Sequence, residues 1–155
     1  MECLADAERI SPAIERLLMA LIRGRFGDME PSPLSFTQQM ALAHVADGGP
    51  LRLRELARLI GTTAATATRT TDALEAAGLV DRSPDPSDGR GVLITPTRVG
   101  RETRRELHRQ LVVLLDRLLR RLEPEERKQF VTLMTDLHEL VEHTERPRAI
   151  ARSEG

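Results

Sequence analysis

The chain has almost no aromatic side chains. Of its 155 residues only three are Phe, and there is no Trp or Tyr. Proteins that bind RNA or single-stranded DNA stack the bases on exposed aromatic rings. This composition argues against those classes, so any nucleic-acid partner is expected to be double-stranded DNA.

Cysteine and long apolar runs are also scarce. The single cysteine, Cys3, excludes an internal disulfide and fits a reducing compartment. No apolar run is long enough to span a bilayer, and the acidic start of the chain lacks the basic and apolar regions of a signal peptide. We therefore expect a cytoplasmic protein without a membrane partner. With 40% hydrophobic and 30% charged residues, it should be globular.

The chain carries little net charge. Its formal value of −1 argues against a protein that coats nucleic acid indiscriminately. Charge is unevenly spread, however, because residues 52–109 hold eleven arginines against eight acidic residues, a net charge of +3. The centre of the chain therefore has a modest basic bias.

Two closely spaced helices are predicted in that centre. Residues 54–60 form a short helical pattern closed by Gly61, and residues 62–77 form a second that ends at Gly78. Helices joined this tightly indicate a helix-turn-helix. By 3 and 4 spacing, Ala64, Ala67, Thr71 and Leu74 share one side of the second helix. The opposite side carries Thr62, Ala65, Thr68, Arg69 and Asp72. One Arg among small side chains suits a helix that enters a DNA groove, so we expect Thr62, Ala65, Thr68 and Arg69 of this side to contact DNA.

A β-hairpin is predicted directly after the second helix. Residues 79–83 and 92–95 are short strand candidates, and the loop expected at 84–91 contains two prolines and an Asp-Gly pair. A helix-turn-helix followed by a hairpin is a winged helix. Arg90, near the end of the loop, is placed to enter a minor groove beside the recognition helix.

An ordered set of residues in this region resembles the MarR family of bacterial transcription regulators. The matching positions, without a gap, are Glu55-Leu56-Ala57, Gly61, Thr66, Thr68-Arg69, Asp72, Leu74-Glu75, Gly78-Leu79-Val80, Asp85-Pro86, Asp88, Arg90, Val92, Thr97 and Gly100. The resemblance implies a sequence-specific regulator that binds double-stranded DNA, with Thr66, Thr68, Arg69 and Arg90 at the DNA. It departs at Gly89 and Asp81, where the family commonly has basic residues.

Helices with apolar stripes flank the winged module. They are expected at about 6–25, at 97–122 with Thr97 as N-cap, and from Pro124 to about 143. Another helix, 36–46, is expected to start at the N-cap Ser35, followed by a single strand rung at 51–53. The stripes exceed what a winged module needs, so they pack together in a monomer or form a dimer. The resemblance implies a homodimer that reads a pseudo-palindromic operator, with half-sites about 34 Å apart.

The resulting fold class is mainly α with a small β-wing. We expect one domain over 1–155, with the winged module at about 35–96 and dimerisation helices at about 4–25 and 97–144. The resemblance also implies a pocket for a small phenolic or lipophilic effector where these helices meet the winged domain. Effector binding would then release a repressor from its promoter.

Other readings of these residues remain open. Arg69 can simply pair with Asp72 at i, i+3 on a solvated surface, and Arg90 can tether the loop to Asp88. The four histidines lack the spacing of a metal site, and no catalytic or cofactor motif stands out, so neither an enzyme nor a cofactor is expected. Two rival functions are a winged helix that docks a protein instead of DNA, and a constitutive ligand-binding protein.

Overall fold

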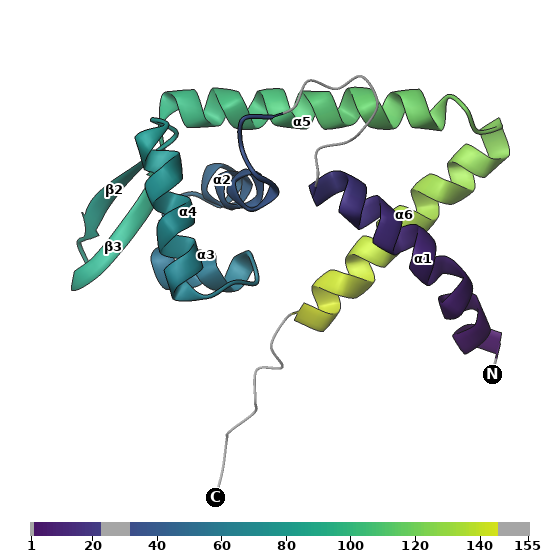
Figure 1. Ribbon diagram of the computed structural model, residues 1–155, viewed down its shortest axis with the longest axis horizontal. Coiled ribbons are helices and arrows are strands. Elements are labelled where there is room, and N and C mark those ends of the chain that lie inside the picture. Colours follow the sequence, from purple (N-terminus) through teal and green to yellow (C-terminus); the bar gives the residue numbers. More distant parts are fainter. Residues whose placement is uncertain (1, 23–31, 146–155) are drawn as a thin grey trace, which may run out of the picture. The chain divides into compact units, whose positions relative to one another are not determined.

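The computed structural model describes residues 2–22 and 32–145, without the side chains of 88–90 and of a few residues at helix ends. The described chain forms two compact units, Met1–Val112 and Val113–Gly155. The elements in Figure 1 are α1 (Glu2–Ile22), α2 (Phe36–Gly48), β1 (Leu51–Arg52), α3 (Leu53–Leu59), α4 (Ala64–Ala76), β2 (Val80–Asp85), β3 (Asp88–Pro96), α5 (Arg98–Leu119) and α6 (Pro124–Glu145). This is the expected fold class.

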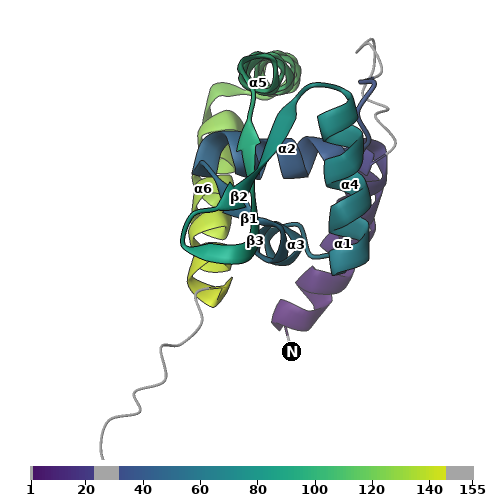
Figure 2. The same ribbon diagram turned by 90° about the vertical axis from the view of Figure 1, so that its left-hand side faces the viewer.

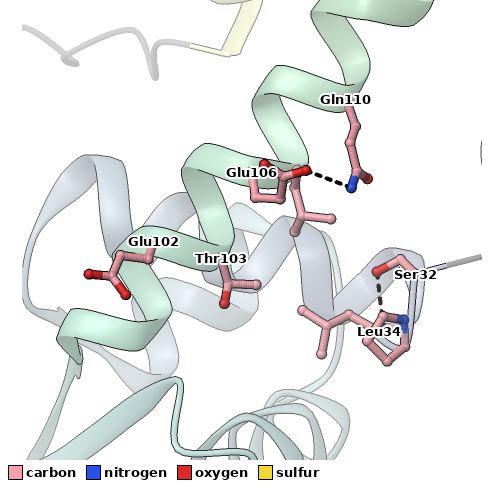
Figure 3. A pocket seen from close by; sticks show the side chains of 8 residues that line it. Ser32, Leu34, Glu102, Thr103, Glu106 and Gln110 are labelled. Atoms are coloured by element: carbon pink, nitrogen blue, oxygen red, sulfur yellow. Dashed lines mark hydrogen bonds between the residues drawn. The ribbon is translucent and has the colours of Figure 1, made fainter. Parts of the chain in front are cut away.

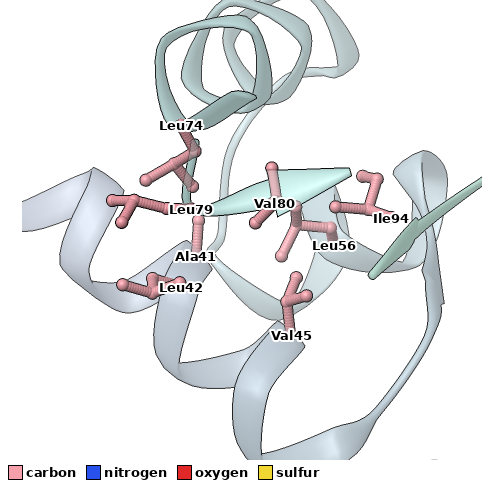
Figure 4. Close-up of a cluster of buried hydrophobic side chains, with 8 residues drawn as sticks. All are labelled: Ala41, Leu42, Val45, Leu56, Leu74, Leu79, Val80 and Ile94. Carbon is pink, nitrogen blue, oxygen red and sulfur yellow. The ribbon is translucent and has the colours of Figure 1, made fainter. Parts of the chain in front are cut away.

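The hydrophobic core lies within the first unit, between α2, α3, α4 and the sheet. Eight side chains with at most 6% exposure form it, drawn together in Figure 4: Ala41, Leu42, Val45, Leu56, Leu74, Leu79, Val80 and Ile94. The helix α2 starts as expected at the N-cap Ser35. The Ser35 hydroxyl accepts a bond from the Gln38 amide, and the Gln38 side chain accepts one from the Ser35 amide.

The strands form a three-stranded antiparallel sheet in the order β1-β3-β2. The rung expected at 51–53 is confirmed, because Leu51 pairs with Ile94 and Arg52 with Leu93. The prediction of a long loop at 84–91 is wrong. β2 continues to Asp85 and β3 begins at Asp88, so only Pro86 and Ser87 lie between them. β2 is an edge strand, the position in a sheet where a proline such as Pro84 is tolerated.

The recognition-helix candidate α4 begins at Ala64, two residues later than expected. Thr63 is its N-cap, because the Thr63 hydroxyl accepts a bond from the Thr66 amide, and Thr62 therefore lies in the preceding turn. Ala67, Thr71 and Leu74 are buried as expected, but Ala64 is exposed because it lies in the first turn, before the helix meets the core. The preceding turn ends at Gly61, whose φ of 62° favours glycine.

The helix α5 is fixed to the winged module at its start. The Thr97 hydroxyl caps it by accepting a bond from the Gly100 amide, and also donates to the carbonyl of Gly78. Gly100 is buried, and a Cβ added there would lie 1.9 Å from the carbonyl oxygen of Leu79. Only glycine allows this approach. α5 ends at Leu119, three residues before the expected Leu122, because the chain turns into the start of α6.

The flanking helices expose their apolar stripes. α1 begins at Glu2, earlier than expected, and its expected end at 25 falls outside the described residues. α6 begins at Pro124 as expected and continues to Glu145. In the described segments, no helix is long and apolar enough to cross a membrane. Exposed apolar side chains include Ile10, Ile14, Leu17 and Leu18 in α1, and Phe130, Leu133, Met134 and Leu137 in α6.

Candidate nucleic-acid interface

The helix α4 and the β2–β3 hairpin lie side by side at one end of the first unit (Figures 1 and 2). On α4, Ala65 and Arg69 are exposed, while Thr66 and Thr68 are half-buried, as is Thr62 in the turn before it. Five of the six predicted DNA-contacting residues therefore share one helix start and its solvent side. The sixth, Arg90, belongs to β3, but its side chain is outside the described residues.

Thr66 and Thr68 differ in what their hydroxyls can offer a ligand. Thr68 donates its hydroxyl hydrogen to the carbonyl of Ala64, at 2.9 Å, so it keeps only acceptor capacity. The Thr66 hydroxyl oxygen accepts from the Thr63 hydroxyl at 3.1 Å and from Arg69 Nη2 at 3.2 Å. Its own hydrogen can therefore be donated to a phosphate or a base.

Arg69 does not pair with Asp72 in this structure. The Asp72 carboxylate instead lies 2.7 Å from Nη2 of Arg82, which is in β2. Arg69 is exposed, and among the described residues it donates to the neutral hydroxyl of Thr66. Its guanidinium thus keeps donors that can reach a base edge or a phosphate.

Arg82 joins the wing to the recognition helix. Besides Asp72, it lies 3.5 Å from Glu75 and donates to the carbonyl of Thr68 at 3.3 Å, with 27% of its side chain exposed. It balances two acidic groups that would otherwise repel phosphates. Sequence reasoning missed this role, although an Asp and a Glu three residues apart on α4 imply a nearby cation.

A second polar cluster holds the turn of the wing. Asp85, 5% exposed, accepts bonds from the Ser87 amide at 2.9 Å and the Ser87 hydroxyl at 2.8 Å, and from Arg52 Nε at 2.6 Å. These bonds, those from Ser87 most of all, lower the pKa of Asp85 below its ordinary value of 3.8. No pattern in the sequence predicts this contact, because 33 residues separate Arg52 from Asp85.

A cavity of about 490 Å³ lies between the start of α5 and the segment before α2, both in the first unit (Figure 3). Leu34 and Leu107 supply apolar walls, and Glu102 and Glu106 supply carboxylates. Glu106 also binds Arg109 and Gln110, which lowers its pKa. The remaining lining residues are Ser32, Pro33, Thr103 and Gln110.

The described residues contain no group of three or more His, Cys, Asp or Glu placed to hold a metal ion. The interface chemistry is instead that of hydrogen-bond donors and cations on a projecting helix and hairpin.

Comparison with known proteins decides the family. The model of the MarR family matches residues 34–92, which include α2, α3, α4 and most of the wing. The HTH-type transcriptional regulator YxaD of Bacillus subtilis (strain 168) is 30% identical over 110 residues, 71% of this chain and 73% of that protein. The chain belongs to the MarR family.

Solved structures agree with this MarR assignment. The RV1404 protein of Mycobacterium tuberculosis superposes with a TM-score of 0.75 at 26% identity, covering 90% of this chain and 94% of that one. BpsR of Bordetella bronchiseptica, whose DNA binding is regulated by 6-hydroxynicotinic acid, gives a TM-score of 0.62 at 25% identity, covering 84% and 98%. The family consists of DNA-binding transcription regulators, so the chain is a transcription regulator of this type.

Proposed function

We propose that this MarR family member is a homodimeric repressor that occludes a promoter and is released by a small-molecule effector. The observation that carries the proposal is the exposed Arg69 on α4, beside a hairpin whose Arg82 balances the nearby acids. A helix with an available Arg, small neighbours and screened acids is suited to a major groove.

The proposed DNA contacts follow from the position of each residue. Ala65 and Arg69 face the groove, and Arg69 donates to a guanine edge or a phosphate. Thr62, Thr66 and Thr68, at the start of the helix, bind the phosphate backbone. Arg90 in the wing enters the adjacent minor groove, where a cation is attracted by the negative potential.

The dimer is proposed to form through α1, α5 and α6. Within each described unit the apolar sides of α1 and α6 stay exposed, which is unusual for a monomer of this size. A two-fold dimer would bury these surfaces and present two α4 helices to successive major grooves of a pseudo-palindromic operator. In this proposal the helices at about 4–25 and 97–144 form the dimer interface, and the winged module at about 35–96 binds DNA.

The effector is proposed to bind the cavity at the start of α5. Its volume suits a small organic molecule, and its apolar walls suit a phenolic or lipophilic one. Because the described lining residues include Glu102 and Glu106 but no basic residue, a neutral phenol fits better than a carboxylate. The ligand would lower operator affinity by favouring a spacing of the two α4 helices that mismatches the half-sites.

Selection of genomic fragments by the purified protein tests the proposal. The parent should enrich a small set of fragments that share a two-fold-related sequence, and Arg69→Ala should enrich them more weakly and with a relaxed preference at one base pair in each half-site. Arg120→Ala is the matched control, because Arg120 is an exposed arginine paired with Asp116 outside the winged module. Failure of the parent to enrich any sequence would instead favour a winged helix that docks a protein.

A further inference from the structure

Arg52 holds a helix-capping position but uses its side chain elsewhere. It is the N-cap residue of α3 by its backbone angles, and its amide donates to Glu55 Oε2 at 3.0 Å. A guanidinium has no acceptor and cannot cap a helix. The side chain extends instead to the wing, where Nε and Nη2 each lie 2.6 Å from Asp85 Oδ2 and Nη2 donates to the Ser87 hydroxyl at 2.9 Å.

This contact joins two strands that are not neighbours. In the sheet β3 lies between β1 and β2, so the Arg52 side chain reaches from β1 past β3 to the last residue of β2. The strand register shifts between Pro84 and Asp85, and Asp85 is buried while Ser83 and Pro84 are exposed. An irregularity of this kind redirects a side chain, which here brings Asp85 to Arg52.

Among the described side chains, the outer part of the wing is mostly exposed. Ser83, Pro84, Pro86 and Ser87 are exposed, and β1 pairs with β3 only at Leu93 and Ile94. A two-stranded hairpin without a buried face is marginally stable. Two Arg52 donors bond to one oxygen of Asp85, and the other oxygen accepts both bonds from Ser87, so this contact joins the folded module to the wing turn.

We propose that Arg52 is a positioning residue for DNA binding, which fixes the Asp85–Ser87 turn and thereby holds the wing strand that carries Arg90 in its DNA-binding position. The inference rests on the proposed wing contact of Arg90. Arg52 acts through Asp85 rather than on DNA, because its guanidinium is already bonded to Asp85 and Ser87 and 27% of its side chain is exposed.

The Asp85→Asn variant separates positioning from charge. Removing a carboxylate close to DNA raises affinity if only electrostatics matters, because one repulsion with phosphate is lost. If Asp85 acts by positioning the wing, Asp85→Asn lowers the affinity, because a neutral amide holds Arg52 less strongly than a carboxylate does. The two accounts therefore differ in direction.

The experiment measures the affinity of the full chain for a selected operator duplex at fixed salt. Arg52→Ala and Asp85→Asn should each weaken operator binding roughly five- to tenfold. When Arg90 has already been replaced by Ala, the same two changes should weaken binding less than about twofold, because the effects of coupled residues do not add. Arg54→Ala, which removes an exposed arginine two residues away in α3, is the control and should not show this dependence on Arg90. Thermal melting verifies that every variant folds. If Arg52→Ala does not fold, the affinity of Asp85→Asn tests the inference alone.

Two results would overturn the inference while leaving the proposed function intact. One is an Asp85→Asn variant that binds as tightly as the parent or more tightly. The other is an Arg52→Ala change that lowers operator affinity as much in the Arg90→Ala variant as in the parent, which would show that Arg52 acts on DNA itself. If Arg90→Ala alone binds like the parent, the proposed wing contact fails and this inference fails with it.

Discussion

At the scale of single residues, Arg69 and Arg90 carry the same charge but should contribute differently to DNA recognition. Arg69→Ala should cost about 1–3 kcal/mol on the operator and relax the preference at one base pair in each half-site, if its contact is bidentate to guanine. Arg90→Ala should weaken binding to operator and scrambled duplex more evenly. A dimer loses two wing cations, so the slope of log affinity against log salt should shrink by roughly 2.

Binding titrations with both duplexes across several salt concentrations measure this difference. Parent-like operator affinity in both variants would remove helix and wing from the DNA interface. Equal sequence dependence in the two variants would keep the interface but reject the division of roles.

Asp85 predicts how acid affects the wing. Its pKa is lowered in the folded chain, mainly by the bonds from Ser87, so its contribution to stability is fully present above 3.8 and is lost as the pH falls through the lower folded value. The melting temperature of Asp85→Asn should therefore lie below that of the parent at pH 7, and the gap should narrow below pH 3.8. A gap that stays constant down to about pH 2.5, well below the ordinary value of 3.8, would contradict this account.

At the scale of elements, the junction between α5 and the end of α4 depends on Gly100. Gly100→Ala should destabilise the fold by about 1–3 kcal/mol, because the new methyl meets the Leu79 backbone rather than a movable side chain. Gly48→Ala is the matched control: Gly48 ends α2, and an added Cβ meets nothing within 4 Å. Chemical denaturation of the three proteins measures the difference, and equal stability of the two variants would contradict the close approach.

Element types could be predicted from the sequence because their patterns are local. The 3 and 4 spacing of Ala67, Thr71 and Leu74 identified the buried side of α4, and Ser35 and Thr97 were recognised as caps from residue type alone. Boundaries were less certain. Either Thr62 or Thr63 can begin a helix, and only the bond from the Thr66 amide selects Thr63.

The candidate site was predicted only in part, for a similar reason. An exposed arginine on a helix surface follows from periodicity, which placed Arg69 correctly on the solvent side of α4. Arg52 and Arg82 bond to partners that only the fold brings close. The spacing of Asp72 and Glu75 implies a nearby cation but does not identify Arg82, and no spacing points to Arg52. The turn at Pro86 and Ser87 was missed because Pro and Gly suggested a loop, whereas Asp85 closes a short turn with its own carboxylate.

At the scale of the whole molecule, the exposed apolar sides of α1 and α6 lead to a prediction about assembly. Sedimentation at micromolar concentration should give twice the 17.3 kDa mass of one chain. Leu133→Glu should shift the protein toward monomer, because it would place a charge on a buried dimer surface, whereas Thr135→Glu is the control from the same helix. A parent that sediments as a monomer would reject the dimer.

The effector proposal also belongs to this scale. A cognate neutral phenol should raise the melting temperature of the free protein while weakening operator binding, because it stabilises only the folded protein and favours the state that releases DNA. Leu107→Ala should reduce both effects together, since Leu107 lines the cavity. A compound that weakens DNA binding equally in this variant would act at another site.

The pairing of β1 with β3 has a consequence for how the chain is synthesised. Leu51 pairs with Ile94, and Ile94 belongs to the same core as Leu42 and Leu56, so the core lacks one wall until the ribosome has made the wing. Contacts between residues so far apart in the sequence form slowly, because a long loop must close first. We therefore expect α2 and α3 to leave the exit tunnel with their apolar sides uncovered, and a translational pause before Ile94 to prolong the period in which a chaperone can bind them.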